Sequence, residues 1–171
     1  MKRKHYLPLL LFLLGLVYAQ NNQANTVASQ TRQGDAWFGL TGGLHSSYPF
    51  GLALHFGVSN PSGADLRVSG SLQFRDGAAS LGIGADGLVT FSEVLPLSIY
   101  GGGGGIVFFE SESFMIDGHG LLGIEYSLSQ QDLEELAVFI EVRIGAALAV
   151  GAIPQPSIPA ASAVLGFNVY F

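Results

Sequence analysis

Apolar and polar residues alternate along most of this chain, in runs of about ten residues that are separated by turn-forming sequences. In one such run, Leu66 and Val68 alternate with Asp65 and Arg67. Alternation with a period of two predicts β-strands with one apolar and one polar face. The pattern recurs over residues 36–45, 50–58, 65–74, 79–91, 97–109, 114–127, 136–150 and 162–171. The sequence therefore predicts an all-β protein.

The segments between these runs have turn and loop compositions, such as SNPSGA, RDGA and GAIPQPSIPAA. The most apolar run, 136–150, contains Glu141 and Arg143, which would point to different sides of a helix but share one face of a strand. An even number of amphipathic strands can close into a barrel without free edges. We therefore predict an eight-stranded antiparallel up-and-down β-barrel over residues 36–171. The GGGGG sequence at 101–105 hides the alternation of its strand, so the facing of that strand stays open.

Periodicity does not say which face of the barrel lies outside. A soluble, lipocalin-like barrel is apolar inside, whereas a transmembrane barrel is apolar outside. Only 12% of the residues are charged, fewer than the surface of a soluble domain normally carries. The apolar face carries aromatic residues near the strand ends, which would form two rims: Phe38, Phe56, Phe91, Tyr126 and Phe171 at one, and Phe50, Phe74, Phe109 and Phe114 at the other. These features favour a transmembrane barrel, with the soluble barrel as the alternative.

The N-terminal residues predict export. A basic start, Lys2 to Lys4, precedes an apolar run over 7–17 and the small residue Ala19, which indicates a signal peptide over residues 1–19. Residues 20–35 are polar and aperiodic, as in a flexible leader. Removal of the signal leaves four of the seven basic residues against thirteen acidic ones, a net charge of −9. We therefore expect no nucleic-acid partner.

The last strand of the prediction resembles a known assembly signal. Phe167, Val169, Tyr170 and Phe171 lie in the sequence FNVYF, which is similar to the terminal signal of bacterial outer-membrane β-barrel proteins. Together with eight predicted strands and a signal peptide, the chain resembles the small barrels of the OmpA, OmpX and OmpW type. This resemblance implies residence in the cell outer membrane, among lipid and lipopolysaccharide. It also implies periplasmic chaperones and the barrel-assembly machinery as partners during biogenesis, with both termini on the periplasmic side.

A transmembrane arrangement would enclose the polar faces of the strands in the lumen. The pattern then predicts a lumen charge network of Asp65, Arg67, Asp86, Asp117, His119, Glu125, Glu141 and Arg143, with His45 and His55 also inward. Hairpin pairing would place Arg67 opposite Asp86, and Arg143 beside His119 and close to Asp117 and Glu141. Such a network fills and stabilises a barrel. The alternative is a gate, in which an arginine changes acidic partners to open a narrow path that prefers cations.

Other candidate chemistries have weaker support. Asp117, His119 and Glu125 could hold a cation, but inward His and Asp side chains usually form salt bridges in a lumen, which is the favoured interpretation. The GGGGG run lacks the Lys-Ser/Thr of a phosphate-binding loop. His45 and Ser47 form an H-x-S that resembles the motif of outer-membrane lipid A deacylases, although the flanking residues differ. The ESES sequence at 110–113 fits a solvated acidic loop better than a calcium site.

The sequence therefore predicts no catalytic residue, no cofactor and no metal, and a structural, envelope-stabilising role. A narrow gated channel or a transporter of small hydrophobic molecules is the alternative, and a lipid-modifying enzyme is less favoured.

Overall fold

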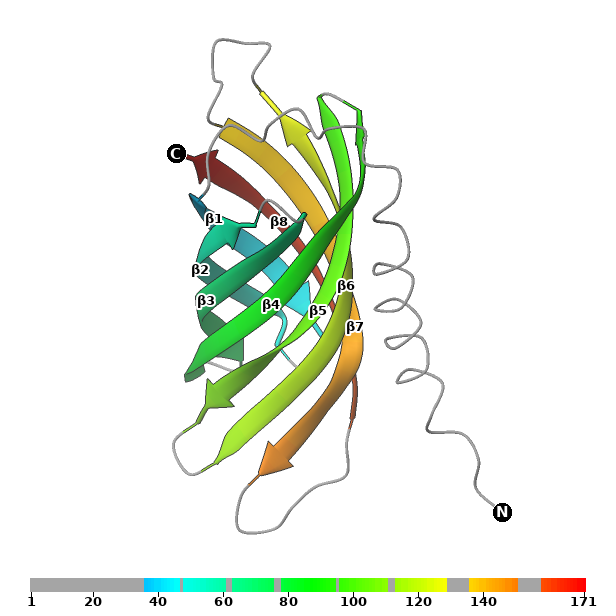
Figure 1. Ribbon diagram of the computed structural model, residues 1–171. Helices are drawn as coiled ribbons and strands as arrows, with labels where there is room; N and C mark the ends of the chain where they lie inside the picture. The colour runs from blue at the N-terminus through cyan, green and yellow to red at the C-terminus, as the bar shows by residue number, and fades with distance from the viewer. Residues whose placement is uncertain are drawn as a thin grey trace, which may run out of the picture. The chain divides into compact units, whose positions relative to one another are not determined.

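A computed structural model describes residues 36–46, 48–60, 63–75, 78–94, 96–110, 113–128, 136–150 and 158–171. It contains eight β-strands (Figure 1). They are β1 (Ala36–His45), β2 (Phe50–Ser59), β3 (Ala64–Arg75), β4 (Ala78–Val94), β5 (Leu97–Phe109), β6 (Phe114–Ser127), β7 (Leu136–Val150) and β8 (Ile158–Tyr170). Among the residues that the structure describes, no helix is long and apolar enough to cross a membrane. The predicted signal peptide and leader lie outside the described residues.

The strands form one closed antiparallel barrel in chain order, which confirms the predicted fold class. Closure occurs where β1 pairs with β8, with Trp37 opposite Tyr170 and His45 opposite Ser162. Because every strand pairs on both sides, the ladder has no free edge. We call the end where β1 begins and β8 ends the terminal rim, and the opposite end the far rim.

The connection between β2 and β3, at the terminal rim, forms the turn that its sequence predicts. The amide of Gly63 donates to the carbonyl oxygen of Asn60 at 2.8 Å, and the amide of Asn60 donates to the carbonyl of Ala64 at 3.2 Å. Gly63 has a φ of 80°, a left-handed conformation that a residue without a Cβ adopts without strain. The SNPSGA sequence therefore closes this hairpin as predicted.

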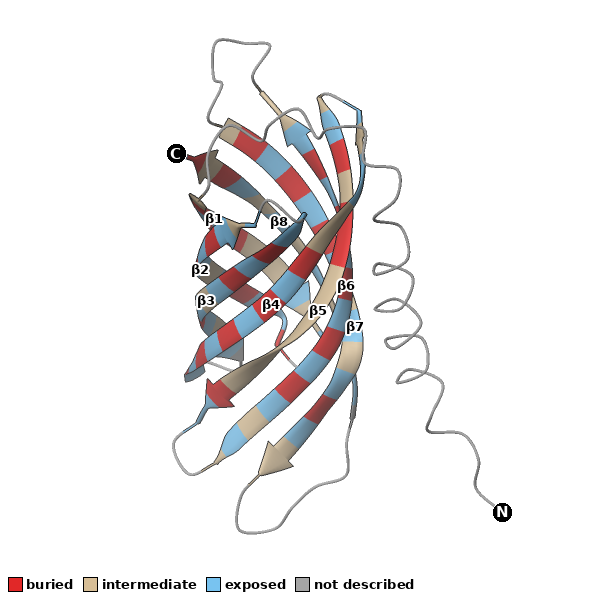
Figure 2. Ribbon diagram, viewed as in Figure 1, coloured by how far each residue is buried: buried red, intermediate tan, exposed pale blue. Residues whose placement is uncertain are grey.

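Burial alternates along the strands with the predicted period of two. Figure 2 shows buried and exposed residues as successive bands, most regularly along β4, β6 and β7. In β6, Asp117, His119 and Glu125 are buried, whereas their neighbours Ile116 and Ile124 are exposed. The polar face therefore lies inside the barrel and the apolar face lies outside.

Two strands extend by three or more residues beyond one of their predicted bounds. β4 continues to Val94 instead of ending at Phe91, because a bulge between Thr90 and Ser92 lets the pairing with β5 resume. β8 begins at Ile158 instead of Ser162 and includes Pro159, which is tolerated at the beginning of a strand. These extensions leave the inward and outward assignments of the central residues unchanged.

Candidate functional site

The outer wall of the barrel is an almost continuous apolar surface. Large aliphatic side chains project from the middle of the strands, with exposed fractions of 66% for Leu54, 66% for Ile83 and 69% for Ile144. A water-soluble monomer rarely exposes a contiguous apolar patch of more than a few hundred Å². The wall therefore matches hydrocarbon as its solvent.

Exposed aromatic rings border this wall at both rims, as the sequence predicts. At the terminal rim, the ring centroid of Phe171 lies 6.3 Å from that of Phe38 and 6.3 Å from that of Phe56. At the far rim, Phe50 and Phe74 stack with centroids 6.2 Å apart. The length of β6 between its outward aromatic residues corresponds to about 30 Å along the barrel axis, at ~3.4 Å per residue and a tilt of ~40°. This height matches the ~30 Å hydrocarbon core of a bilayer.

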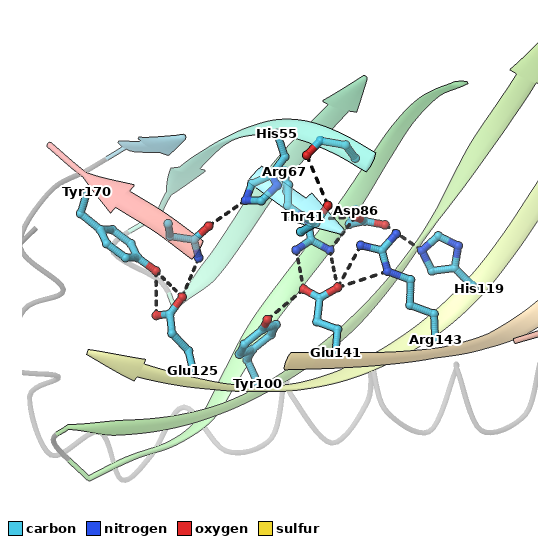
Figure 3. Close-up of polar contacts among 12 residues, drawn as sticks. Thr41, His55, Arg67, Asp86, Tyr100, His119, Glu125, Glu141, Arg143 and Tyr170 are labelled. Carbon is cyan, nitrogen blue, oxygen red and sulfur yellow. Dashed lines mark hydrogen bonds and ion pairs between the residues drawn. The ribbon is translucent and has the colours of Figure 1, made fainter. Parts of the chain in front are cut away.

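The lumen contains a cluster of ionised side chains around Arg67, shown in Figure 3. Nε and Nη2 of Arg67 donate to Oδ2 of Asp86 at 3.0 and 2.8 Å. Its Nη2 also lies 3.1 Å from Oε2 of Glu141, and its Nη1 contacts Oε1. Arg67 is 3% exposed, Asp86 3% and Glu141 0%. The guanidinium thus bridges β4 and β7 from β3, across the interior of the barrel.

Glu141 is the acceptor on which three donors converge. The Tyr100 hydroxyl donates to its Oε1 at 2.8 Å, while Nε and Nη2 of Arg143 lie 3.1 and 2.9 Å from its Oε2. Together with Arg67, these contacts satisfy both carboxylate oxygens. A fully buried carboxylate is tolerated only under such conditions, since an unpaired one costs several kcal/mol.

A chain of histidine and aspartate side chains extends this cluster toward the far rim. Nε2 of His119 lies 3.0 Å from Oδ1 of Asp86, and its Nδ1 lies 3.1 Å from Oδ1 of Asp117. Nε2 of His45 lies 3.0 Å from the other oxygen of Asp117. Both nitrogens of His119 face carboxylates, and only the doubly protonated ring can donate to both.

We call the residues joined by these contacts, other than His45, the central cluster: Arg67, Asp86, Tyr100, Asp117, His119, Glu141 and Arg143. With His119 protonated, it holds three cations and three anions and is balanced in charge. This balance allows the cluster to remain inside a barrel that is surrounded by apolar surface.

A second polar group lies nearer the terminal rim and joins β2, β6 and β8. Nε2 of His55 donates to Oδ1 of Asn168 at 2.7 Å, and Nδ2 of Asn168 donates to Oε2 of Glu125 at 2.6 Å. The Tyr170 hydroxyl lies 2.7 and 2.8 Å from the two oxygens of Glu125. Asn168 and Tyr170 thus link the closing strand to the interior of the barrel.

Apolar side chains fill the lumen around these groups on the terminal side. We call this set the aromatic plug: Trp37, Leu88, Tyr100, Leu121, Ala137 and Tyr170, with exposed fractions between 1% and 7%. Glycines make room for the rings, since a Cβ at Gly57 would overlap the indole of Trp37 and one at Gly123 would overlap the ring of Tyr100. Inward glycines therefore allow large rings to cross a narrow barrel.

The far half of the lumen contains a cavity of about 50 Å³. We call it the polar chamber. The polar residues that line it are Thr41, Ser69, Ser71, Gln73, Ser162, Arg67 and Arg143, and the apolar ones include Leu52, Ile106 and Phe108. Toward the far rim, the rings of Tyr48 and Phe108 pack with centroids 5.4 Å apart, and His45 lies 5.8 Å from Tyr48. The Tyr48 hydroxyl donates to Glu110 at 2.8 Å.

The structure places the predicted lumen residues inside the barrel, with one difference in pairing. Arg67 lies opposite Asp86, as predicted. The expectation for Arg143 was wrong, because Arg143 pairs with Leu121 and His119 pairs with Gly145. The β6–β7 connection is centred one residue later than assumed, which shifts the pairing by two positions. An even shift keeps each side chain on the same face, so Arg143 still points inward, and it binds Glu141, which the sequence had also placed close to it.

The remaining predicted residues have varied positions. Asp65 is 8% exposed on the inner face of β3. In β8, Phe167 is 37% exposed and Tyr170 is buried at 6%, and Phe171, which follows β8, is 61% exposed. Ser47 of the H-x-S sequence lies outside the described residues. Among the described residues, no group of three or more His, Cys, Asp or Glu side chains could hold a metal ion.

Several interior residues were not anticipated from the sequence. Tyr100 and Phe108 face inward from β5, where the five glycines had hidden the alternation. Tyr48 lies in the β1–β2 turn, which sequence reasoning assigned to a loop. Asn168 lies two residues before Tyr170 and therefore on the same inward face of the strand. This alternation was the only sign in the sequence that Asn168 could take part in the interior polar group.

Comparison with known proteins supports the architecture. The N-terminal β-barrel domain of Pseudomonas aeruginosa OprF is similar with a TM-score of 0.52 and 14% identity, covering 79% of this chain and 98% of that one. The fold is that of an eight-stranded transmembrane β-barrel. Neisserial surface protein A is also similar, with a TM-score of 0.40, 13% identity and coverage of 80% and 96%. No protein-family model matches the barrel sequence, and no curated protein matches it.

Proposed function

We propose that this protein is an integral barrel of the bacterial outer membrane with a structural, envelope-stabilising role. The observation that carries the proposal is the reversed polarity of the barrel, with aliphatic side chains on the outer wall and Arg67, Asp86 and Glu141 enclosed. A wall of this kind binds lipid acyl chains and lipopolysaccharide. The central cluster then braces β3, β4 and β7 against one another from within.

The same cluster closes the lumen to solutes. Its side chains reach across the interior from opposite strands, and the aromatic plug fills the space between the cluster and the terminal rim. Eight-stranded barrels have interiors that side chains can fill, whereas larger barrels leave channels. The barrel therefore acts as a structural protein with a closed lumen, and not as a general pore.

Cell fractionation and gel electrophoresis test the location of the protein. We expect it in the outer-membrane fraction, with a faster electrophoretic mobility before boiling than after, because a closed barrel resists unfolding in detergent. Recovery in the soluble periplasm, or one mobility under both conditions, would contradict the proposal. In planar bilayers, the purified barrel should produce no stable conductance steps.

A narrow gated channel is the second candidate, favoured by one feature of the cluster. Arg143 shares Oε2 of Glu141 with Arg67, and its side chain is 14% exposed, so it borders the polar chamber instead of being enclosed. A change of partner by this arginine would alter the path through the lumen. Cation-selective conductance steps that change in the Arg143→Ala variant would favour this channel over a barrel with a closed lumen.

Assembly of the proposed barrel would use its closing strand. Phe167 and Phe171 project outward from the β8 region, where a membrane-embedded partner can contact them. We propose that the barrel-assembly machinery recognises this apolar row after periplasmic chaperones deliver the chain. The Phe171→Ala variant should then accumulate as unassembled protein in cells, whereas the purified variant should refold in detergent as the unmodified protein does.

A further inference from the structure

The polar chamber has side-chain atoms whose hydrogen-bonding capacity is not met by the protein. Oγ of Ser71 and Oε1 of Gln73 are buried and have no hydrogen-bond partner among the described residues. Both residues line the chamber, and Ser71 is 6% exposed. A buried polar atom without a partner costs about 1–3 kcal/mol, so two of them in one cavity require an explanation.

Arg143 adds donors to the same cavity. It uses Nε and Nη2 for Glu141, and its Nη1 makes no hydrogen bond within the part of the chain that the structure describes. The chamber walls therefore present a guanidinium donor and two acceptors to an interior space. A small polar ligand would satisfy these unpartnered atoms, whereas an apolar ligand would leave them without hydrogen bonds.

The size of the chamber selects the ligand. A water molecule needs roughly 10–15 Å³ of such volume, so a cavity of about 50 Å³ holds roughly four water molecules. We propose that the polar chamber is a hydration site that holds a small group of ordered water molecules on the far side of the central cluster. These waters bond to Ser71, Gln73 and Arg143, and they hydrate one face of the cluster.

The terminal half of the lumen provides the contrast. The aromatic plug fills it together with the hydrogen-bonded group of His55, Glu125 and Asn168, and the Phe139 ring is 2% exposed there. On the chamber side, Phe108 is equally buried, with 1% exposed, and its ring lines the cavity. The lumen is therefore divided into a wet half and a dry half, with the central cluster at the boundary. This division goes beyond the structural role proposed above.

Phe108 and Phe139 form a matched pair for an experiment. Brief X-ray irradiation of the full folded protein in detergent micelles generates hydroxyl radicals from water, and side chains beside bound water are oxidised first. Mass spectrometry then gives the oxidation rate of each ring. We expect Phe108 to be oxidised at least five times faster than Phe139, although both are buried to the same extent.

Two variants fill the chamber and complete the test. The Ser71→Leu variant replaces an unpartnered hydroxyl with a bulkier apolar group, and Gln73→Leu replaces an unpartnered amide oxygen with an apolar group of similar size. In whichever variant keeps the heat-dependent gel mobility of a folded barrel, the Phe108 rate should fall at least threefold while that of Phe139 stays constant. Equal rates for the two rings in the unmodified protein, or a Phe108 rate that filling the chamber leaves unchanged, would overturn the proposal.

Discussion

Replacement of Arg67 by Met is the most direct test of the central cluster. The change removes a buried guanidinium that bonds to Asp86 at 2.8 Å and also to Glu141. Methionine fills a similar volume with apolar atoms, so the packing loss is small. The main effect is electrostatic, because two carboxylates with exposed fractions of 3% and 0% lose their shared cation.

The structure sets the expected magnitude. Breaking a buried ion pair by removing one partner costs about 3–5 kcal/mol. Here Asp86 keeps its contact with His119, and Glu141 keeps Tyr100 and Arg143, so we expect a loss near the lower limit, about 3 kcal/mol. With a denaturant dependence of about 2 kcal/mol per molar urea, the unfolding midpoint should fall by about 1.5 M.

The assay is urea unfolding of the barrel in lipid vesicles, followed by Trp37 fluorescence and by the heat-dependent gel mobility. Arg143→Met is the matched control, since that side chain is 14% exposed and, among the described residues, bonds to Glu141 alone, which retains Arg67. We expect a smaller loss than for Arg67→Met, about 1.5 kcal/mol, which is the lower limit for a hydrogen bond to a charged group.

Neutralising a stranded carboxylate should partly restore stability, so Glu141→Gln in the Arg67→Met background should be more stable than Arg67→Met alone. An Arg67→Met midpoint equal to that of the unmodified barrel, or an Arg143→Met loss larger than the Arg67→Met loss, would refute the assignment of Arg67 as the centre of the cluster.

Three further predictions test the wall and the lumen. In vesicles, Leu54→Arg in the middle of the wall should lower the unfolding free energy by about 2–4 kcal/mol. Val94→Arg at the end of β4, where the residue is 73% exposed, should lower it by less than about 1 kcal/mol. Equal losses in urea titrations would argue against a lipid-facing wall. Trp37 is the single tryptophan and faces the lumen, so brominated lipids should quench its fluorescence weakly. The double variant Trp37→Phe, Phe38→Trp moves the indole to the outer wall, where quenching should be strong. Stronger quenching in the unmodified protein than in the double variant would place Trp37 outside. Tyr100→Phe removes a donor to the buried Glu141 and should lower the unfolding free energy by about 1–3 kcal/mol, and an unchanged midpoint would show that water replaces the hydroxyl.

The strands could be predicted from the sequence because the two faces of each strand have different surroundings. Asp65 and Arg67 alternate with Leu66 and Val68 since one face meets lipid and the other meets the lumen, and this contrast persists along the whole strand. Parity alone therefore assigns Glu141 and Arg143 to the interior, and a shift of the pairing by two residues does not change that assignment.

Pairing and packing across the lumen could not be obtained in this way. The contact of Arg67 with Glu141 joins strands that are not neighbours, so it depends on closure of the barrel and on side-chain length, not on a local pattern. Tyr100 was hidden because the adjacent glycines carry no polarity, and Tyr48 was hidden because a turn has no period. The polar chamber depends on the sum of all these side chains and has no signature in any single segment.

The seam between β1 and β8 imposes a condition on how the molecule reaches its final state. Trp37 and Tyr170 are partners although almost the whole barrel sequence lies between them. Until β8 arrives, both β1 and β7 present unpaired amides and carbonyls, which hydrocarbon cannot satisfy. Loss of β8 would therefore expose two strand edges at once. We expect pairing of β8 with β1 to be the last step of insertion, and to occur cooperatively.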